Sequence, residues 1–344
     1  MWESIMIYVR NCWYVAAWTP DLPTDAPTAV RILSEPIVLW QADGQWRAHE
    51  DRCVHRLAPL SQGRCEGASL RCMYHGLRFD EAGRCIEIPG QDKIPDQARL
   101  RSYPVIDRHS WIWVWMGDPG LADADLIPEA VGFDDPDYIL GRGFLDYAAE
   151  ARLINDNLLD FSHLTYVHAN SFQATSAFAD TPPRITSLER GIRVERWVLN
   201  SSRPSVRGES GPVDSWSSYD FLIPGILLMK GGNFPVGTAQ ACDFGRPDYA
   251  QALGGVTFTS QAVTPTGEGT ARYFFSWGPH RDHGDEALRD QLMKLAAMAF
   301  AEDKVMIEGQ QKIINATPAP RIMPTIHDKG VTLYNRMVDR LANA

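Results

Sequence analysis

The chain has 344 residues, and 33 Lys and Arg against 43 Asp and Glu give it a formal net charge of −10 at pH 7. Hydrophobic residues make up 44% and charged residues 22% of the sequence, which is typical of a folded globular protein and excludes a low-complexity or fibrous one. Such an acidic chain repels phosphate backbones unless basic residues cluster, and no such cluster occurs, so we expect no nucleic-acid partner.

No stretch approaches the roughly 18 consecutive apolar residues that a membrane-spanning helix needs, and the first residues lack the basic and then apolar pattern of an export signal. We therefore expect a cytoplasmic protein with no membrane contact. Met1 and Met6 are both possible starts of the natural chain. The 6 cysteines are too sparse for a disulfide scaffold.

The pattern of predicted secondary structure changes near residue 120, which predicts two domains, residues 1–120 and 121–344. Short β-runs separated by Gly, Asp and Pro turns fill the first domain, as expected for a small antiparallel β-domain. The predicted strands there are 36–40, 45–49, 70–73 and 111–116.

The second domain mixes longer strands with helices. Its predicted strands are 193–200, 215–222, 255–263 and 271–277, and its predicted helices are 155–168 and 285–315. The fold class is therefore α+β, with a β-rich module followed by a module in which helices flank an antiparallel sheet.

Two Cys/His pairs stand at turns of the first domain. Cys53 and His55 form a C-x-H pair, and Cys72 and His75 form a C-x2-H pair. Two loops that each offer a thiolate and an imidazole can hold a [2Fe–2S] cluster with both Cys on one iron and both His on the other, the Rieske arrangement. Zinc is the alternative, although zinc motifs normally pair Cys with Cys and His with His.

A second dense group of polar residues lies in the segment 155–168. Asp160 and His163 would share a helical face, but His163 and His168 are five residues apart in the sequence, about 140° around a regular helix. For both imidazoles to bind one ion, we expect the helix to bulge or break between them. A surface helix with satisfied polar groups is the alternative.

The predicted helix 285–315 carries an apolar stripe, and Asp303 falls on it. A carboxylate on a buried face is costly unless it is paired or bound to a metal. We therefore expect His163, His168 and Asp303 to form a 2-His-1-carboxylate triad, which leaves open positions for O2 on non-haem Fe(II). Asp156 is the rival carboxylate, because it is close to the histidines in sequence.

These motifs resemble the Rieske non-haem iron oxygenases, and they are most similar to the oxygenase components of vanillate and dicamba O-demethylases. The resemblance extends over nearly the whole chain. It is carried by the cluster motif 53–75, the runs 11–16, 88–91, 111–115 and 300–303, and the segment 156–168.

The resemblance implies a role for each of these residues. The cluster ligands would be Cys53, His55, Cys72 and His75, and the ligands of the catalytic iron would be His163, His168 and Asp303. Asp160 would bridge a cluster histidine to an iron histidine of a neighbouring subunit, and Asn157 would lie near the iron without being a firm ligand. From its position one helical turn before His163, we also expect the Asp160 carboxylate to accept a hydrogen bond from that imidazole.

The resemblance further implies a head-to-tail homotrimer in which electrons cross the subunit interface. They would come from a separate reductase or ferredoxin reductase that uses NAD(P)H, and the sequence agrees, since it holds neither a G-x-G-x-x-G run after a strand nor a plant-type ferredoxin motif. The implied reaction uses O2 to hydroxylate and O-demethylate a methoxylated aromatic acid such as vanillate.

Three alternatives remain at this point. Related oxygenases hydroxylate aryl methyl groups or dioxygenate phenoxybenzoates, and a Rieske electron-transfer protein would need only the first 120 residues. The polar residues that hold the substrate in the demethylases have only approximate counterparts, Met229, Gln261 and Lys294. Lys230 or Arg272 could pair with a substrate carboxylate, with a solvated surface charge as the alternative for either.

Overall fold

The computed structural model describes residues 8–169, 171, 177–201 and 211–343, so Met1 and Met6 lie outside the described residues. The chain forms two compact units. One contains residues 8–129 together with 264–268, and the other contains the described residues of 130–263 and of 269 onward. The change of pattern at residue 120 falls just after the last strand of the first unit, where short 3-10 turns follow.

The first unit is built from three small antiparallel sheets. Their strand orders are β1-β11-β10, β2-β3-β4-β9 and β5-β6-β7-β8. The strands are β1 (Cys12–Trp18), β2 (Thr28–Ile32), β3 (Glu35–Ala42), β4 (Gln45–Glu50), β5 (Arg64–Cys65), β6 (Ser69–Arg71), β7 (Arg78–Asp80), β8 (Cys85–Glu87), β9 (Ser102–Tyr103), β10 (Val105–Arg108) and β11 (Trp111–Met116).

Strand β11 is buried on both faces, and this explains its sequence. Every residue of β11 is buried, so its sequence WIWVWM shows no alternation of apolar and polar residues. The unit also takes in a short piece of the later chain, because Thr264 Oγ1 donates to the carbonyl of Val15 and the amide of Leu33 donates to the carbonyl of Pro265. The first 120 residues therefore do not make up the whole unit.

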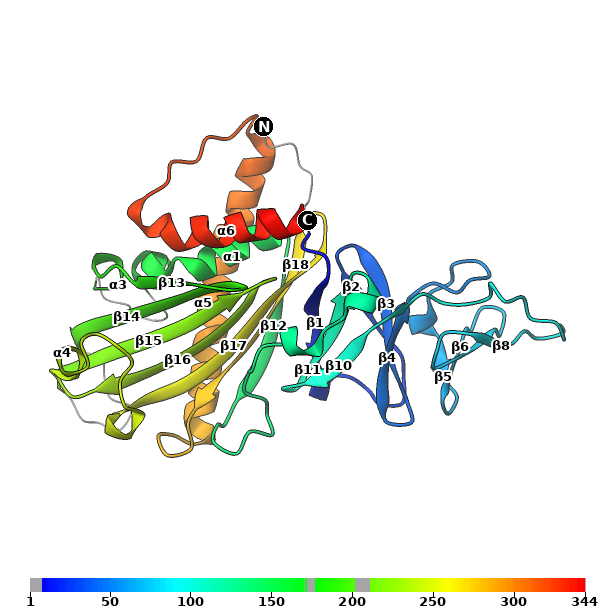
Figure 1. Ribbon diagram of the computed structural model, residues 1–344, viewed down its shortest axis with the longest axis horizontal. Helices are drawn as coiled ribbons and strands as arrows, with labels where there is room; N and C mark the ends of the chain where they lie inside the picture. The colour runs from blue at the N-terminus through cyan, green and yellow to red at the C-terminus, as the bar shows by residue number, and fades with distance from the viewer. Residues whose placement is uncertain (1–7, 170, 172–176, 202–210, 344) are drawn as a thin grey trace. The chain divides into compact units, whose positions relative to one another are not determined.

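The second unit is a seven-stranded antiparallel sheet with helices (Figure 1). Its strand order is β12-β18-β17-β16-β15-β14-β13. The strands are β12 (Gly141–Tyr147), β13 (Arg184–Leu188), β14 (Gly191–Ser201), β15 (Val213–Leu222), β16 (Ile226–Phe234), β17 (Gly254–Gly267) and β18 (Thr270–Pro279). The helices are α1 (Ala151–Leu159), α2 (Leu164–Val167), α3 (Ala177–Asp180), α4 (Thr238–Ala241), α5 (Glu286–Ala316) and α6 (Lys329–Ala342).

Register fixes which side chains of the sheet face the helices. Tyr219 lies opposite Met229, which lies opposite Thr259, and the Tyr219 hydroxyl donates to the carbonyl of Leu159 in α1. Because successive side chains of a strand point to opposite faces, Lys230 belongs to the other face, opposite Ser218 and Phe258. We call these the helix face and the outer face of the sheet.

The predicted α+β architecture is confirmed, and each predicted strand or helix overlaps an observed one. The segment 155–168 is broken as expected. Helix α1 ends at Leu159, Asp160 is extended, and a 3-10 turn (Phe161–His163) leads into α2. None of the helices in the described ranges combines the length and apolar character needed to cross a bilayer.

Candidate metal centres

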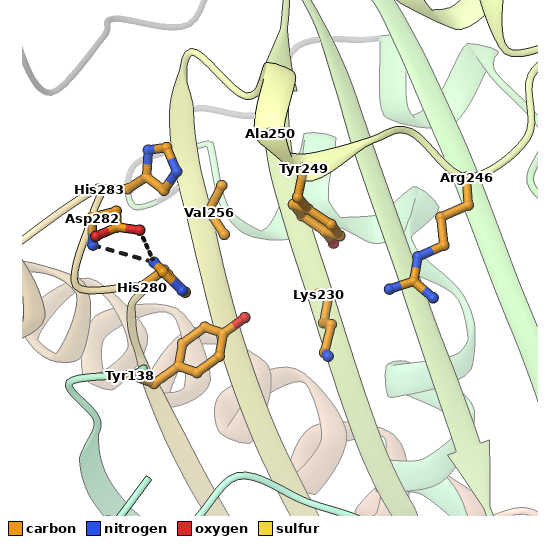
Figure 2. A pocket seen from close by; sticks show the side chains of 9 residues that line it. All are labelled: Tyr138, Lys230, Arg246, Tyr249, Ala250, Val256, His280, Asp282 and His283. Carbon is orange, nitrogen blue, oxygen red and sulfur yellow. Dashed lines mark hydrogen bonds and ion pairs between the residues drawn. The ribbon is translucent and has the colours of Figure 1, made fainter. Parts of the chain in front are cut away.

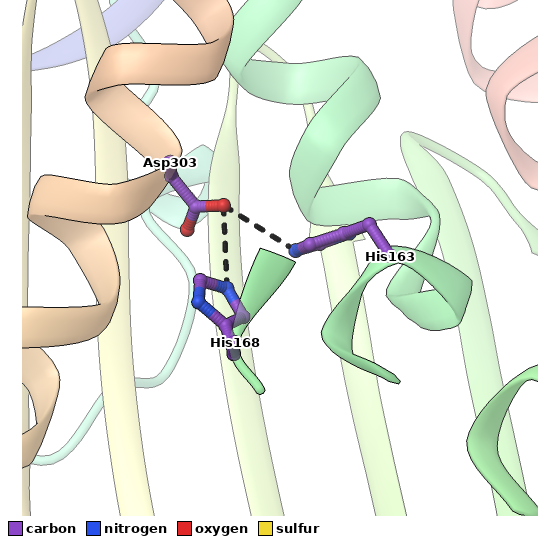
Figure 3. Close-up of side chains that lie close together, drawn as sticks. All are labelled: His163, His168 and Asp303. Atoms are coloured by element: carbon purple, nitrogen blue, oxygen red, sulfur yellow. Dashed lines mark ion pairs between the residues drawn. The ribbon is translucent and has the colours of Figure 1, made fainter. Parts of the chain in front are cut away.

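Three side chains predicted as ligands of one metal meet in the second unit. One ligand atom from each of His163, His168 and Asp303 lies within 4.8 Å of the others. Asp303 Oδ1 is 3.5 Å from His163 Nε2 and 3.2 Å from His168 Nε2 (Figure 3). Asp303 is buried on α5, as its place on the apolar stripe predicts. The donor set fits a 2-His-1-carboxylate iron site.

The break after α1 orients His163. The carboxylate of Asp160 accepts a hydrogen bond from the amide of Ser162 at 2.9 Å and so caps the 3-10 turn. His163 Nδ1 donates to the backbone carbonyl of Asp160 at 2.5 Å, which leaves Nε2 facing Asp303. The expected hydrogen bond from His163 to the Asp160 carboxylate is therefore wrong, because Asp160 is extended and not part of a continuous helix.

A carboxylate that the sequence reasoning missed orients His168. Glu302 Oε2 accepts from His168 Nδ1 at 2.9 Å and from Ser171 Oγ at 2.6 Å. Burial by itself lowers the pKa of His168, but the hydrogen bonds and charges of Asp303 and Glu302 raise it further than burial lowers it. The position of Glu302 directly before Asp303 is a signal that could have identified it.

Burial dominates at the other imidazole. It lowers the pKa of His163, and the nearby charge of Asp303 opposes this shift only in part. A histidine with a lowered pKa is neutral near pH 7, which is the form that binds metal ions.

Two residues of α1 have different surroundings. The Asn157 amide nitrogen donates to Asp303 Oδ1 at 3.1 Å and lies 3.4 Å from His163 Nε2, so Asn157 adjoins the triad. Asp156 instead accepts a hydrogen bond from Asn335 of α6 at 2.8 Å. The structure thus brings Asp303 to the histidines and places Asp156 elsewhere. Burial raises the pKa of Asp156 to about 6.

The other predicted centre lies on two loops of the first unit. Cys53 and Cys72 are each 1% exposed, whereas His55 and His75 are exposed and their ring centroids are 4.5 Å apart. Burial, together with the neighbouring Cys72 thiol, raises the pKa of Cys53 to about 11. A metal that binds thiolate would reverse this preference for the protonated thiol. Two buried sulfur donors and two surface imidazoles fit the donor set of a Rieske cluster.

One arginine, Arg71, stabilises the loop that carries His75. Arg71 Nη1 donates to the carbonyl of Gly76 at 2.7 Å, and its guanidinium also pairs with Glu66 and Glu87. Hydrogen bonds from the amide of Leu57 to the carbonyl of Cys53, and from Gly76 to Cys72, close the two loops.

The side chains considered for substrate binding are on different faces. Met229 and Gln261 belong to the helix face, and Gln261 Oε1 is buried without a hydrogen-bond partner among the described residues. Lys230 is on the outer face, and Arg272 is held by both carboxylate oxygens of Asp146. Neither Lys230 nor Arg272 is therefore placed to pair with the carboxylate of a substrate on the helix face. Lys294 is exposed on α5.

Comparisons with known proteins cover both units. The Rieske [2Fe-2S] domain family matches residues 12–104, and the family of vanillate O-demethylase oxygenase C-terminal domains matches residues 147–344. A toluene-4-sulfonate monooxygenase system iron-sulfur subunit of Comamonas testosteroni is 37% identical, over 98% of both chains.

Two further comparisons connect the chain to O-demethylases. A vanillate O-demethylase oxygenase subunit of a Pseudomonas species is 33% identical, over 98% of this chain and 96% of its own length. The crystal structure of dicamba monooxygenase bound to 3,6-dichlorosalicylic acid superposes with a TM-score of 0.88 at 30% identity, over 98% of both chains.

Proposed function

The chain belongs to the Rieske non-haem iron oxygenases with a vanillate O-demethylase-type C-terminal domain, and from this premise we propose its metal ligands, its substrate class and its assembly. It is an oxygenase component, and its cofactors are a [2Fe–2S] cluster and a mononuclear non-haem iron. A Rieske electron carrier, considered from the sequence, does not account for the domain at 147–344.

For the cluster, the proposed ligands are Cys53, His55, Cys72 and His75, and for the iron they are His163, His168 and Asp303. When bound, the cluster supplies electrons singly and the iron supplies the site where O2 is reduced. The protein presents the two Nε2 atoms because each Nδ1 is already engaged, in His163 by the Asp160 carbonyl and in His168 by Glu302. Asn157 orients Asp303 through its amide.

The proposed reaction is hydroxylation of a methyl group on a small aromatic anion, and O-demethylation of a methoxylated aromatic acid such as vanillate is the first candidate. One O2, two electrons and two protons convert the methoxy group to a hemiacetal and water. The hemiacetal then separates into a phenol and formaldehyde. The observation that carries this proposal is the His163, His168 and Asp303 triad in a chain of O-demethylase type.

Hydroxylation of an aryl methyl group is the second candidate. The toluene-4-sulfonate monooxygenase subunit is 37% identical to this chain, whereas the vanillate O-demethylase subunit is 33% identical. The product would then be a benzylic alcohol, and no formaldehyde would form. Both candidates share the aromatic anion and the methyl carbon and differ only in the atom that bears the methyl group.

A turnover screen with a surrogate reductase and NADH distinguishes these reactions. The substrates are methoxybenzoates, toluenesulfonates and phenoxybenzoates, and the products are scored as formaldehyde, benzylic alcohol or ring diol. Formaldehyde in equal amount to a new phenol supports O-demethylation. Benzylic alcohol supports the second candidate, and ring diol as the main product overturns the methyl-hydroxylation proposal. Asp303→Ala is the inactive control.

We also propose that the partner is a separate reductase or ferredoxin reductase and that the chain assembles as a head-to-tail homotrimer. Asp160 supports this assembly, because only one oxygen of its carboxylate, Oδ1, has a hydrogen bond among the described residues. The other oxygen, Oδ2, would accept from His75 of a neighbouring subunit and link that subunit's cluster to this subunit's iron.

A further inference from the structure

A cavity of about 490 Å³ opens on the second unit, and its lining includes none of the three proposed iron ligands (Figure 2). Its lining includes Tyr138, Lys230, Arg246, Tyr249, His280 and His283. Lys230 belongs to the outer face of the sheet, whereas Tyr219, which contacts α1, belongs to the helix face. The sheet therefore separates this cavity from α1.

Two cations of the cavity have rings as neighbours. Lys230 Nζ is 5.5 Å from the ring centroid of Phe258, and the Arg246 guanidinium is 6.0 Å from that of Tyr249. Neither forms an ion pair with a carboxylate within the described ranges of the chain. Together the two cations create a positive potential inside a concave site, although the chain as a whole has a net charge of −10.

The other groups of the cavity fit the same kind of ligand. The Tyr249 hydroxyl is buried and has no hydrogen-bond partner among the residues described. Figure 2 shows the polar ends of Tyr138, Lys230, Arg246 and Tyr249 pointing toward one space. The acidic residue of the lining, Asp282, has a side chain that is 83% exposed and lies 3.6 Å from His280 Nδ1.

We propose that this cavity is a second ligand site, which binds a small aromatic anion, an aryl carboxylate or aryl sulfonate. The anionic group would meet Lys230 and Arg246 and accept from the Tyr249 hydroxyl, as charge-assisted hydrogen bonds favour. The ring of the ligand would pack against Tyr138 and Tyr249. A volume of about 490 Å³ lies within the usual range for small-molecule pockets. The inference does not depend on which reaction occurs at the iron.

Equilibrium dialysis of the metal-loaded enzyme with toluene-4-sulfonate tests the proposal by stoichiometry. We expect the wild-type chain to bind one equivalent more at saturation than the double variant Lys230→Gln/Arg246→Gln. The difference of one holds whether or not the iron site also binds the probe, so failure of the proposed reaction does not affect the result. Equal stoichiometry in the two proteins overturns the site.

Two further measurements test the class of ligand and the role of the cations. Arg246→Gln alone should weaken binding of the probe at this cavity about tenfold, as loss of a charge-assisted contact does. Arg272 is already paired with Asp146, so Arg272→Gln should leave this binding unchanged. Inorganic sulfate at the same concentration should not displace the probe. Displacement by sulfate would show a simple anion site and overturn the aromatic assignment.

Discussion

At the scale of single residues, the two histidines of the triad are oriented by different means. His163 is held by a backbone carbonyl, which no side-chain substitution removes, whereas His168 is held by the carboxylate of Glu302. Carboxylates that hold metal-binding imidazoles strengthen them as ligands. The orientation of His168 can therefore be altered by a side-chain substitution, whereas the contact that orients His163 cannot be removed in this way.

Glu302→Gln should weaken binding of the mononuclear iron about 10- to 100-fold, the usual effect of losing such a partner, while the absorption of the cluster stays unchanged. Iron per chain after dialysis against a chelator measures this. The matched control is Glu286→Gln, in the first turn of the same helix. Full iron retention in Glu302→Gln together with normal turnover would contradict the positioning role.

Asp156 gives a prediction of how stability depends on pH. Its pKa is about 6 in the folded protein and near 3.8 ordinarily, because it is buried. Below about pH 4 both folded and unfolded chains hold the proton, so burial has no ionisation cost. Between about pH 4 and pH 6 the unfolded chain has released the proton while the folded chain still holds it, so stability falls as the pH rises through this range and levels off above it.

Asp156→Asn removes that cost and keeps an acceptor for Asn335. The variant should therefore be more stable than the wild type by about 1–3 kcal/mol at pH 8 and by about half as much at pH 5. Unfolding midpoints in urea at the two pH values measure the difference. Asp339→Asn, at an exposed ion pair with Arg152, is the control. The same gain at both pH values would refute the explanation.

At the scale of elements, the break at Asp160 decides the geometry of the metal centre. A continuous helix would point His163 and His168 apart, and the capped 3-10 turn brings them together instead. Because His163 contacts the carbonyl and not the carboxylate of Asp160, the carboxylate can change without losing this contact.

Asp160→Asn should therefore leave both metal centres filled, since Asn also caps a turn, but should greatly slow transfer of electrons from cluster to iron. Reoxidation of the pre-reduced cluster by O2 in the presence of substrate measures this in a single turnover. Ser162→Ala is the control, because only the backbone amide of Ser162 caps the turn. Reoxidation at the wild-type rate in Asp160→Asn excludes the bridging role.

The elements also show what sequence patterns could predict. The break was predictable because two histidines five residues apart cannot share a helical face. Strand β16 was missed because its Lys230-Gly231-Gly232 run hides the apolar pattern, and α6 was missed because it buries only three residues. The contact of His163 with a backbone carbonyl has no sequence signature, since every residue carries that group.

At the scale of the whole molecule, each proposed metal centre belongs to its own compact unit. Cys53 and Cys72 are part of a core that also contains Trp40, Leu70 and Phe79. Asp303 lies on α5 in the other unit, where Phe300 of the same helix packs on Tyr273. Loss of one metal should therefore leave the other unit folded.

His75→Ala should abolish the Rieske spectrum and keep the mononuclear iron, whereas Asp303→Ala should lose that iron and keep the spectrum. Iron analysis and visible absorption of both purified variants check this. Loss of both metals in either variant would show that the two centres fold together, and unchanged absorption in His75→Ala would contradict the ligand assignment.

The two variants also test the proposed trimer. If each iron receives electrons from the cluster of the next subunit, a mixed ring can join the intact cluster of an Asp303→Ala chain to the intact iron site of a His75→Ala chain. Every head-to-tail trimer that contains both variants has one interface at which an intact cluster faces an intact iron site. When equal amounts of the two chains assemble at random, about one interface in four is of this kind. Co-expressed variants should thus recover about a quarter of wild-type turnover, and each variant alone should recover none.

Separately purified chains, mixed without exchange of subunits, are the control. Absence of recovery in co-purified mixed trimers would instead show that electrons pass within one chain.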